Sequence, residues 1–420
     1  MSNSKENLWK TLNHKEPDRL VVDFGATTVT GIHVKVVEQL REHFGLERKP
    51  VKVVEPFQML GEIDNDLIQA LGVDAVGIFP ERDMFNVSLS KSWKPFTTLW
   101  DQVVLLPEDF NCQKDDNGDL LMYPGGNTSL KPSGRMPKTG YFFDAIERQG
   151  IIDDSSMRPE DSIEEFGYID QNDIDYWKIQ TERVLDPQKG AVATFGGTAL
   201  GDAAMVPGIG LACPKGIRSI TEWYLSTVMR ESYISKMFDI QTDIAIENLS
   251  MINDAVGTKI DVAFICGTDF GTQNSTFCSS ETYIKLWMPF YKKVNEWIHS
   301  NTGWKTFKHS CGAVASFIPY FIESGFDIIN PIQINASGMD SEMLKNEYGK
   351  DIVFWGGGVD TQGVFAFGKP EDVRDQVRRQ CDILGNDGGF VFNTVHNIQA
   401  NVPIENIIAM FEALDEYKKA

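Results

Sequence analysis

Residues 304–312 read WKTFKHSCG, a short apolar strand that ends in polar and small residues. Strands of this kind are expected at six places: 191–195 (AVATF), 261–266 (DVAFIC), 304–308 (WKTFK), 327–331 (DIINP), 351–355 (DIVFW) and 390–395 (FVFNTV). Short runs rich in Val, Ile and Phe are typical of strands that are buried on both faces of a parallel sheet. The second half of the chain therefore predicts an α/β fold.

The stretches between these strands predict helices, for example 282–299 and 371–384. Alternating strands and helices indicate βαβ units. No GxGxxG or GxxxxGK[ST] phosphate loop follows any strand, which excludes the commonest nucleotide-binding open sheets. About eight strands over this length favour a TIM-type (β/α)8 barrel formed by residues 1–420 as a single domain.

Two further parts surround the barrel. An N-terminal extension is expected to form a helix over 4–12, capped by Ser4 and stopped before Pro17, ahead of a first strand within 20–24. Turn-rich stretches over 93–140 predict antiparallel hairpins, and an acidic surface excursion covers 153–175. We interpret approximately 90–175 as a hairpin-rich insertion; a domain boundary in the acidic stretch is the alternative.

Charge and cysteine content exclude several classes of function. The chain has 39 basic and 60 acidic residues, a net charge of −21, which disfavours nucleic acid and anionic membranes as partners. Its first fifteen residues lack an apolar segment and no window resembles a spanning helix, so we expect a cytoplasmic protein. The six cysteines are then expected to be reduced thiols or metal ligands.

His309 and Cys311 are the first candidate metal ligands. Alternate positions of an extended chain project to the same side, so the two side chains can share one ion. Imidazole and thiolate suit zinc, and catalytic zinc sites keep three protein ligands and an open position. His396 is the candidate third ligand because it ends the strand 390–395, and parallel barrel strands all end on one face.

Asp269 and Asp360 follow two other strands and are the candidate catalytic carboxylates. Every candidate also has a structural alternative. The two Asp residues can cap helices, Cys311 can be a core thiol, and the two His residues can simply form hydrogen bonds. Several aromatic residues near strand ends can line a pocket for an aromatic ether or belong to the core: Trp304, Trp355, Phe365 and Phe367.

Four segments resemble the uroporphyrinogen decarboxylase superfamily, in particular its corrinoid-dependent methyltransferase branch. They are 13–19 (NHKEPDR), 269–293, 309–312 (HSCG) and 396–406 (HNIQANVPIEN). The resemblance is thin over about 85–175 and good from there to the end of the chain. It implies a TIM-type barrel, a zinc ion, and transfer of a methyl group between a small methylated substrate and a corrinoid protein.

Carried over by position, this resemblance makes His309 and Cys311 the first two zinc ligands. In the coenzyme M methyltransferases the third ligand is a cysteine of the closing motif, where this chain has His396, so Asp269 and Glu281 stay open as alternatives. The cobalamin would belong to a separate corrinoid protein, because this chain has no Asp-x-His-x-x-Gly motif. A homodimer stays open.

Two other functions compete with a methyltransferase. A uroporphyrinogen decarboxylase, a carboxy-lyase of porphyrin biosynthesis, would need basic residues to grip a polycarboxylate, but the corresponding segment 23–33 contains no arginine and the chain is strongly acidic. A binding protein without turnover is the third class. The clustered ionisable strand ends argue against it.

Overall fold

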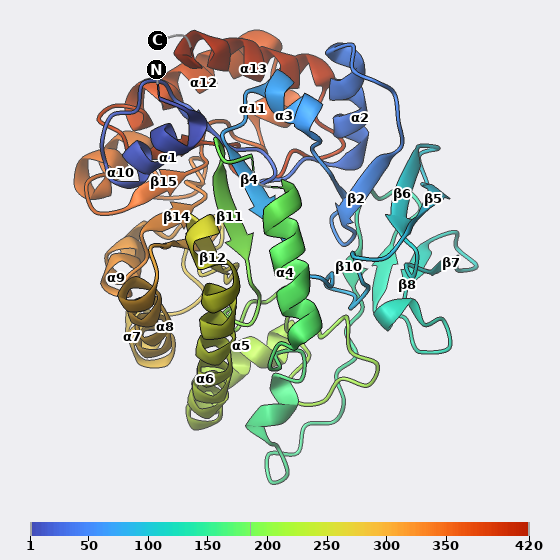
Figure 1. The fold of residues 1–420 in the computed structure, drawn as a ribbon. Helices are drawn as coiled ribbons and strands as arrows, with labels where there is room; N and C mark the ends of the chain where they lie inside the picture. Colours follow the sequence, from blue (N-terminus) through green and yellow to red (C-terminus); the bar gives the residue numbers. More distant parts are fainter. Residues whose placement is uncertain (1, 185, 419–420) are drawn as a thin grey trace.

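A computed structural model describes residues 2–184 and 186–418 (Figure 1). Eight strands form one sheet in the order β1-β16-β15-β14-β13-β12-β11-β4, with every neighbouring pair parallel. Their bounds are β1 Val21–Val22, β4 Ala75–Ile78, β11 Gly190–Thr194, β12 Val262–Cys266, β13 Lys305–His309, β14 Ile328–Asn330, β15 Val353–Trp355 and β16 Phe390–Phe392. The predicted α/β barrel is confirmed.

Asp74 joins the two ends of this sheet. Its backbone N–H donates to the Val22 carbonyl at 2.8 Å, and its carboxylate accepts from the Val22 N–H at 2.9 Å. Arg19 pairs with the same carboxylate. β1 and β4 form no ladder of their own, so these bonds complete a nearly closed barrel.

Helices cover the outside of the barrel (Figure 1). Those that follow the strands are α4 Gln171–Val184, α5 Ile220–Met229, α6 Glu231–Val256, α7 Ser280–Leu286, α8 Met288–Asn301, α9 Ile318–Glu323, α10 Ser341–Tyr348, α11 Val364–Phe367, α12 Pro370–Leu384 and α13 Ile404–Lys418. Each strand from β11 onward is therefore followed by at least one helix. The carboxyl ends of the strands meet at one mouth.

The N-terminal helix α1 (Ser4–Leu12) lies against β1, β4, β11 and β16. Its Leu8 and Leu12 pack with inward side chains of the barrel strands, including Phe307 and Trp355. The cap is Asn3 rather than the predicted Ser4, because Asn3 and Glu6 form a reciprocal capping box. The barrel interior is thus filled with apolar side chains.

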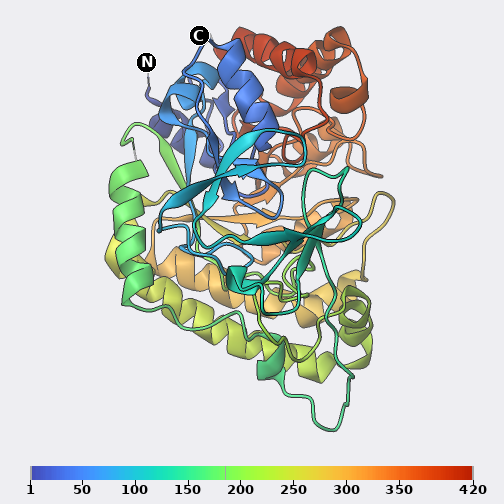
Figure 2. The same cartoon turned by 90° about the vertical axis from the view of Figure 1, so that its right-hand side faces the viewer.

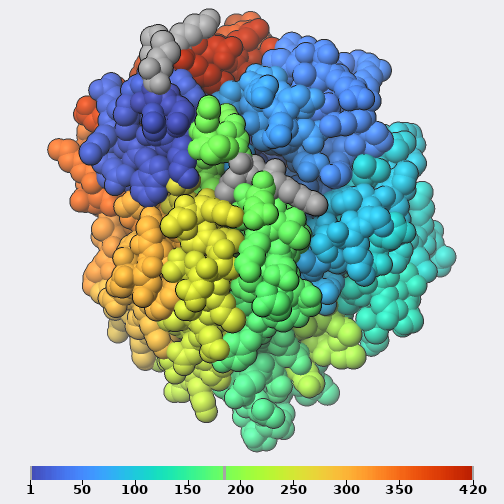
Figure 3. Space-filling view, in the orientation of Figure 1, coloured from blue at the N-terminus to red at the C-terminus, as the bar shows by residue number. Residues whose placement is uncertain are grey.

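Two four-stranded sheets lie beside the barrel (Figures 1 and 2): β10-β9-β8-β7 is antiparallel, and β3-β2-β6-β5 contains one parallel pair, β2 and β6. Their strands are β2 Val51–Glu55, β3 Leu60–Gly61, β5 Trp93–Thr97, β6 Val103–Pro107, β7 Cys112–Lys114, β8 Leu120–Met122, β9 Gly134–Met136 and β10 Asp144–Ala145. β2 and β3 lie before the predicted start of the insertion. They nevertheless belong to these sheets, because β2 pairs in parallel with the distant β6. They follow α2 (Val34–His43) and precede α3 (Asn65–Leu71). Figure 3 shows the insertion as the blue-green flank of the molecule.

The helix expected over 282–299 is divided, because α7 ends at Leu286 and α8 begins at Met288. Pro289 lies in the first turn of α8, where its missing N–H is tolerated but would interrupt a continuous helix. The helix expected over 371–384 is confirmed as α12. Among the helices of the described residues, none is long and apolar enough to cross a membrane.

Candidate metal centre

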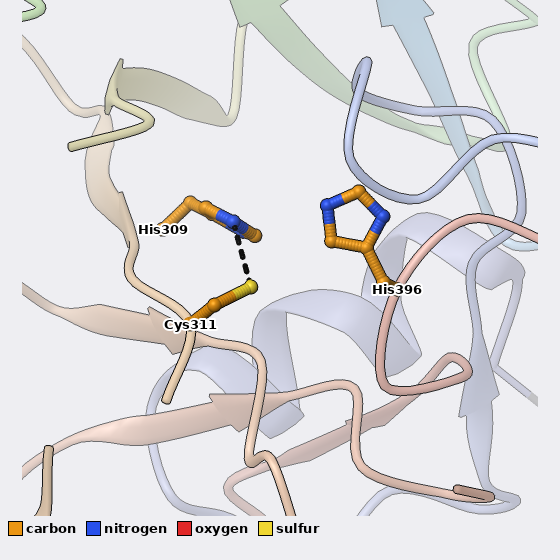
Figure 4. Close-up of side chains that lie close together, drawn as sticks. All are labelled: His309, Cys311 and His396. Carbon is orange, nitrogen blue, oxygen red and sulfur yellow. Dashed lines mark hydrogen bonds between the residues drawn. The ribbon is translucent and has the colours of Figure 1, made fainter. Parts of the chain in front are cut away.

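Three side chains predicted as metal ligands meet at the mouth of the barrel (Figure 4). His309 is the last residue of β13, Cys311 lies two residues further, and His396 follows β16. Figure 4 shows the His396 ring pointing toward the other two from the opposite side. One potential ligand atom from each residue lies within 4.8 Å of the others, so a single cation could contact all three.

A hydrogen bond fixes the His309 ring. Its Nδ1 lies 2.6 Å from Asn330 Oδ1, an acceptor, so Nδ1 carries the proton and Nε2 keeps its lone pair. This Nε2 accepts a hydrogen bond from the Cys311 thiol, whose Sγ lies 3.4 Å away (Figure 4). The ring is 3% exposed, and this burial lowers the pKa of His309 to about 4. A neutral imidazole is the form that binds metals.

His396 is held differently. Its Nδ1 accepts a hydrogen bond from the Asn397 N–H at 2.8 Å. The His396 and His309 rings are 5.4 Å apart between centroids and nearly perpendicular. Burial lowers the pKa of His396 to about 4. Metal binding through Nε2 would place the ring proton on Nδ1, so the ring would have to release the Asn397 N–H.

Asp269 lies directly beside the ligand group. Its Oδ1 accepts from the Cys311 N–H at 2.6 Å and lies 3.6 Å from His309 Nε2. Although 39% of its side-chain surface is accessible, the surrounding protein raises the pKa of Asp269. Burial, followed by the negative charge of Asp269, raises the pKa of the Cys311 thiol well above its ordinary value.

Close backbone contact holds the Cys311 loop in place. Gly312 has φ +93°, and a Cβ at this position would overlap the backbone of Gly271. The Ala313 N–H donates to the Thr272 carbonyl at 2.8 Å. The Gly312 N–H donates to Gln333 Oε1 at 2.7 Å. Loops that follow three neighbouring strands thus fix the position of the thiol.

Asp360 does not belong to the ligand group. Its Oδ1 accepts from Asn335 Nδ2 and from the Gln362 N–H, both at 2.9 Å. It lines a separate polar pocket of about 150 Å³ together with Asn335, Gln376 and Arg379. Glu281 lies exposed in the first turn of α7. The Asp360 carboxylate therefore accepts an N–H within the turn before α11, and because the N-cap of α11 is Gly363, Asp360 is not the helix cap that was its structural alternative.

The four aromatic residues considered for substrate binding do not form an exposed pocket. Trp304 is buried, and its Nε1 donates to the Gly257 carbonyl near the amino end of β13. Trp355 and Phe365 are fully buried, whereas Phe367 is 78% exposed. The half-exposed aromatic pair at the rim is instead Tyr224 and Phe277, stacked with centroids 4.9 Å apart.

Several residues near the ligand group escaped the sequence analysis. Asn330 could have been found, because it ends a strand just as His309 does. Asp202 lies on the long loop after β11, and burial with the added charge of Asp269 raises its pKa to about 6. Lys308 is fully buried behind the ligand group. No local sequence pattern distinguishes Asp202 or Lys308 from other polar residues.

Comparisons with known proteins agree with the fold. Residues 212–417 match the family described as Uroporphyrinogen decarboxylase (URO-D). A uroporphyrinogen decarboxylase of Actinobacillus succinogenes is 39% identical over 54 residues, 13% of this chain and only 15% of that protein. A methyltransferase from Methanosarcina mazei aligns over 99% of both chains, with a TM-score of 0.54 and 14% identity. The match to the family model covers just under half of the chain and shows a similarity to the uroporphyrinogen decarboxylase superfamily, whereas the solved structure supports the shared fold alone.

Proposed function

We propose that this protein, as a member of that superfamily, is a zinc-dependent methyltransferase that moves a methyl group from a small methoxylated substrate to a separate corrinoid protein. The observation that carries the proposal is the convergence of His309, Cys311 and His396 within 4.8 Å at the barrel mouth. Two imidazoles and a thiol are the donor types that zinc prefers. The Methanosarcina mazei structure of the same fold is described as a methyltransferase.

The residues present fit a zinc ion. Asn330 leaves the His309 Nε2 lone pair free for a metal, as an outer hydrogen-bond partner commonly does. The raised pKa of the Cys311 thiol means that without a nearby cation it would stay protonated and unreactive. A bound cation reverses this, because a coordinated thiol loses its proton. The site therefore suits a metal better than a free cysteine nucleophile.

The third ligand is His396 or Asp269. His396 belongs to the closely spaced group, although its Nδ1 now accepts the Asn397 N–H. Asp269 Oδ1 is 3.6 Å from His309 Nε2 but accepts the Cys311 N–H. We favour His396 as the ligand, because Asp269 is then free to act as an acid.

A bound zinc ion would supply Lewis acidity toward the methoxyl oxygen, so that the alkoxide or phenoxide leaves as the methyl group moves to the cobalamin of the partner. Asp269 would carry the proton for the departing oxygen, since its accessible carboxyl group has a raised pKa and faces the ligand group. Asp360, the second predicted catalytic carboxylate, would order the loop after β15.

Uroporphyrinogen decarboxylase is the second candidate. The matching family and the curated relative carry that name, which favours it. The loop after β1, residues 23–33, has no arginine or lysine to bind a polycarboxylate, and the chain has a net charge of −21. These two features favour the methyltransferase.

The proposal is tested by incubating the zinc-loaded protein with reduced cobalamin and a panel of methoxylated compounds, following methylcobalamin by its absorption. We expect methylation with the wild type and none with C311S. Uroporphyrinogen turnover that survives chelation, without methylcobalamin formation, would establish the decarboxylase instead.

A further inference from the structure

Lys308 is a fully buried lysine directly before the ligand His309. Its Nζ donates to the Thr268 carbonyl at 2.6 Å and to the His309 carbonyl at 2.8 Å. Three aromatic rings surround the amino group, with centroids at 4.8 Å for Phe270, 5.4 Å for Phe321 and 5.7 Å for Tyr291. Because side chains alternate along β13, His309 faces the mouth while Lys308 faces the helices.

The two carbonyls belong to the loops that build the metal centre. Thr268 directly precedes Asp269, and the His309 carbonyl leads through Ser310 to Cys311. The same loops are joined at two more points, where Asp269 accepts the Cys311 N–H at 2.6 Å and Ser310 Oγ accepts the Phe270 N–H at 2.9 Å. Lys308 therefore donates hydrogen bonds to both loops from the side that faces the helices.

Stability alone does not explain a lysine here. Among residues 2–184 and 186–418, no carboxylate forms an ion pair with Lys308, although a buried ammonium group is costly without one. Cation–π contacts and the two hydrogen bonds to carbonyl groups offset part of that cost. An apolar side chain of similar length would fill the space between the aromatic rings without the cost of burying a charge.

We propose that Lys308 is a positioning residue of the metal centre, which holds the Thr268–Asp269 and His309–Cys311 segments together so that their side chains meet one ion. The inference rests on the zinc site proposed above. The buried amino group of Lys308 would hold the two loops together, a role that neither the three candidate ligands nor Asp269 performs.

The test compares K308M with K345M. Lys345 makes the same kind of contact elsewhere, since its Nζ donates to the carbonyls of Leu384 at 2.9 Å and Gly388 at 2.6 Å, before β16 begins. Zinc affinity is measured by competition with a chromophoric chelator, and the ligand field by the absorption of the Co²⁺-substituted proteins. Circular dichroism reports folding.

We expect K308M to bind zinc about 10- to 100-fold more weakly, as found when outer partners of metal ligands are removed, with an altered Co²⁺ spectrum. K345M should match the wild type in both readouts. Equal zinc affinity in K308M and wild type, or equal losses in both variants, would overturn the inference. If K308M does not fold, K308Q is compared with wild type instead. Its shorter side chain should not reach both carbonyls, so an altered Co²⁺ spectrum supports the inference and an unchanged spectrum overturns it.

The wild type separates this inference from the proposed function. If the wild-type protein binds no zinc, both the metal site and the positioning role of Lys308 are refuted. A wild-type protein that binds zinc while K308M binds it equally well refutes only the role of Lys308.

Discussion

Asn330 Oδ1 lies 2.6 Å from His309 Nδ1, and Asn330 Nδ2 donates to the Trp355 carbonyl at 2.7 Å. The amide is therefore oriented by β15, and it in turn orients the imidazole on β13. Outer partners of this kind raise the basicity of a ligand imidazole and fix its tautomer. The proposed zinc site would thus depend on a residue that does not itself touch the ion.

We predict that N330A weakens zinc binding about 10- to 100-fold, because the His309 ring loses the acceptor that holds its proton on Nδ1. Isothermal titration of the metal-free protein with zinc gives the affinity. N406A is the matched control, since Asn406 is equally buried and its Nδ2 donates to the carbonyls of Phe365 and Gly368. Unchanged affinity in N330A would show that Asn330 does not support a ligand.

H396A and D269N identify the third ligand. We expect H396A to lose zinc, and D269N to keep zinc but lose most of the methyl-transfer rate, because the amide cannot deliver a proton. Elemental analysis and the methylcobalamin assay measure the two effects separately. The reverse result for zinc would make Asp269 the ligand and leave His396 as the acceptor of the Asn397 N–H.

G312A should disrupt the Cys311 loop. Gly312 has φ +93°, and the new methyl group would overlap the Gly271 backbone, so we expect a loss of about 2 kcal/mol or more in the free energy of unfolding. Chemical denaturation measures it, and zinc content should fall as well. G303A is the control, because a Cβ on Gly303 has no neighbour within 4 Å.

Asp327 predicts a pH-dependent contribution to stability. Burial tends to raise its pKa, but hydrogen bonds from His299, the Thr306 N–H and Lys305 outweigh burial and hold the pKa at about 2, against an ordinary 3.8. A depressed carboxyl pKa stabilises the fold above the unfolded value, and the contribution is lost as pH falls toward the folded value.

D327N should therefore lower the free energy of unfolding by on the order of 2 kcal/mol at pH 7. The difference from wild type should shrink between about pH 4 and pH 2, as followed by urea denaturation. D116N, at an exposed position, serves as control. A difference that stays constant down to pH 2 would show that the effect is not due to the charge of Asp327.

The barrel, and the closeness of His309, Cys311 and His396 at its mouth, were predictable because their signals are local. The predicted strands 304–308 and 390–395 are each followed directly by a histidine, and parallel strands bring such ends together, which placed His309 beside His396 across 87 residues. β4 was not predicted, since its four residues, including Gly77, form only a weak apolar run. β2 was not predicted as part of the side sheet, because its partner β6 lies about fifty residues away.

The parts of the site that escaped prediction depend on three-dimensional contacts. Lys308 looked like an ordinary polar strand residue, and only the packed helices show that its amino group is buried. Asp360 follows a strand as Asp269 does, yet the turn after β15 directs it to Asn335. Strand-end position therefore selects candidates, whereas loop conformation decides which of them meet.

Zinc content of the purified wild-type protein beside C311S, determined by elemental analysis without added metal, tests the metal centre most directly. The account predicts close to one zinc per wild-type chain and almost none in the variant, with both proteins folded. Absence of zinc from the wild type after reconstitution, or equal zinc in both proteins, would contradict it.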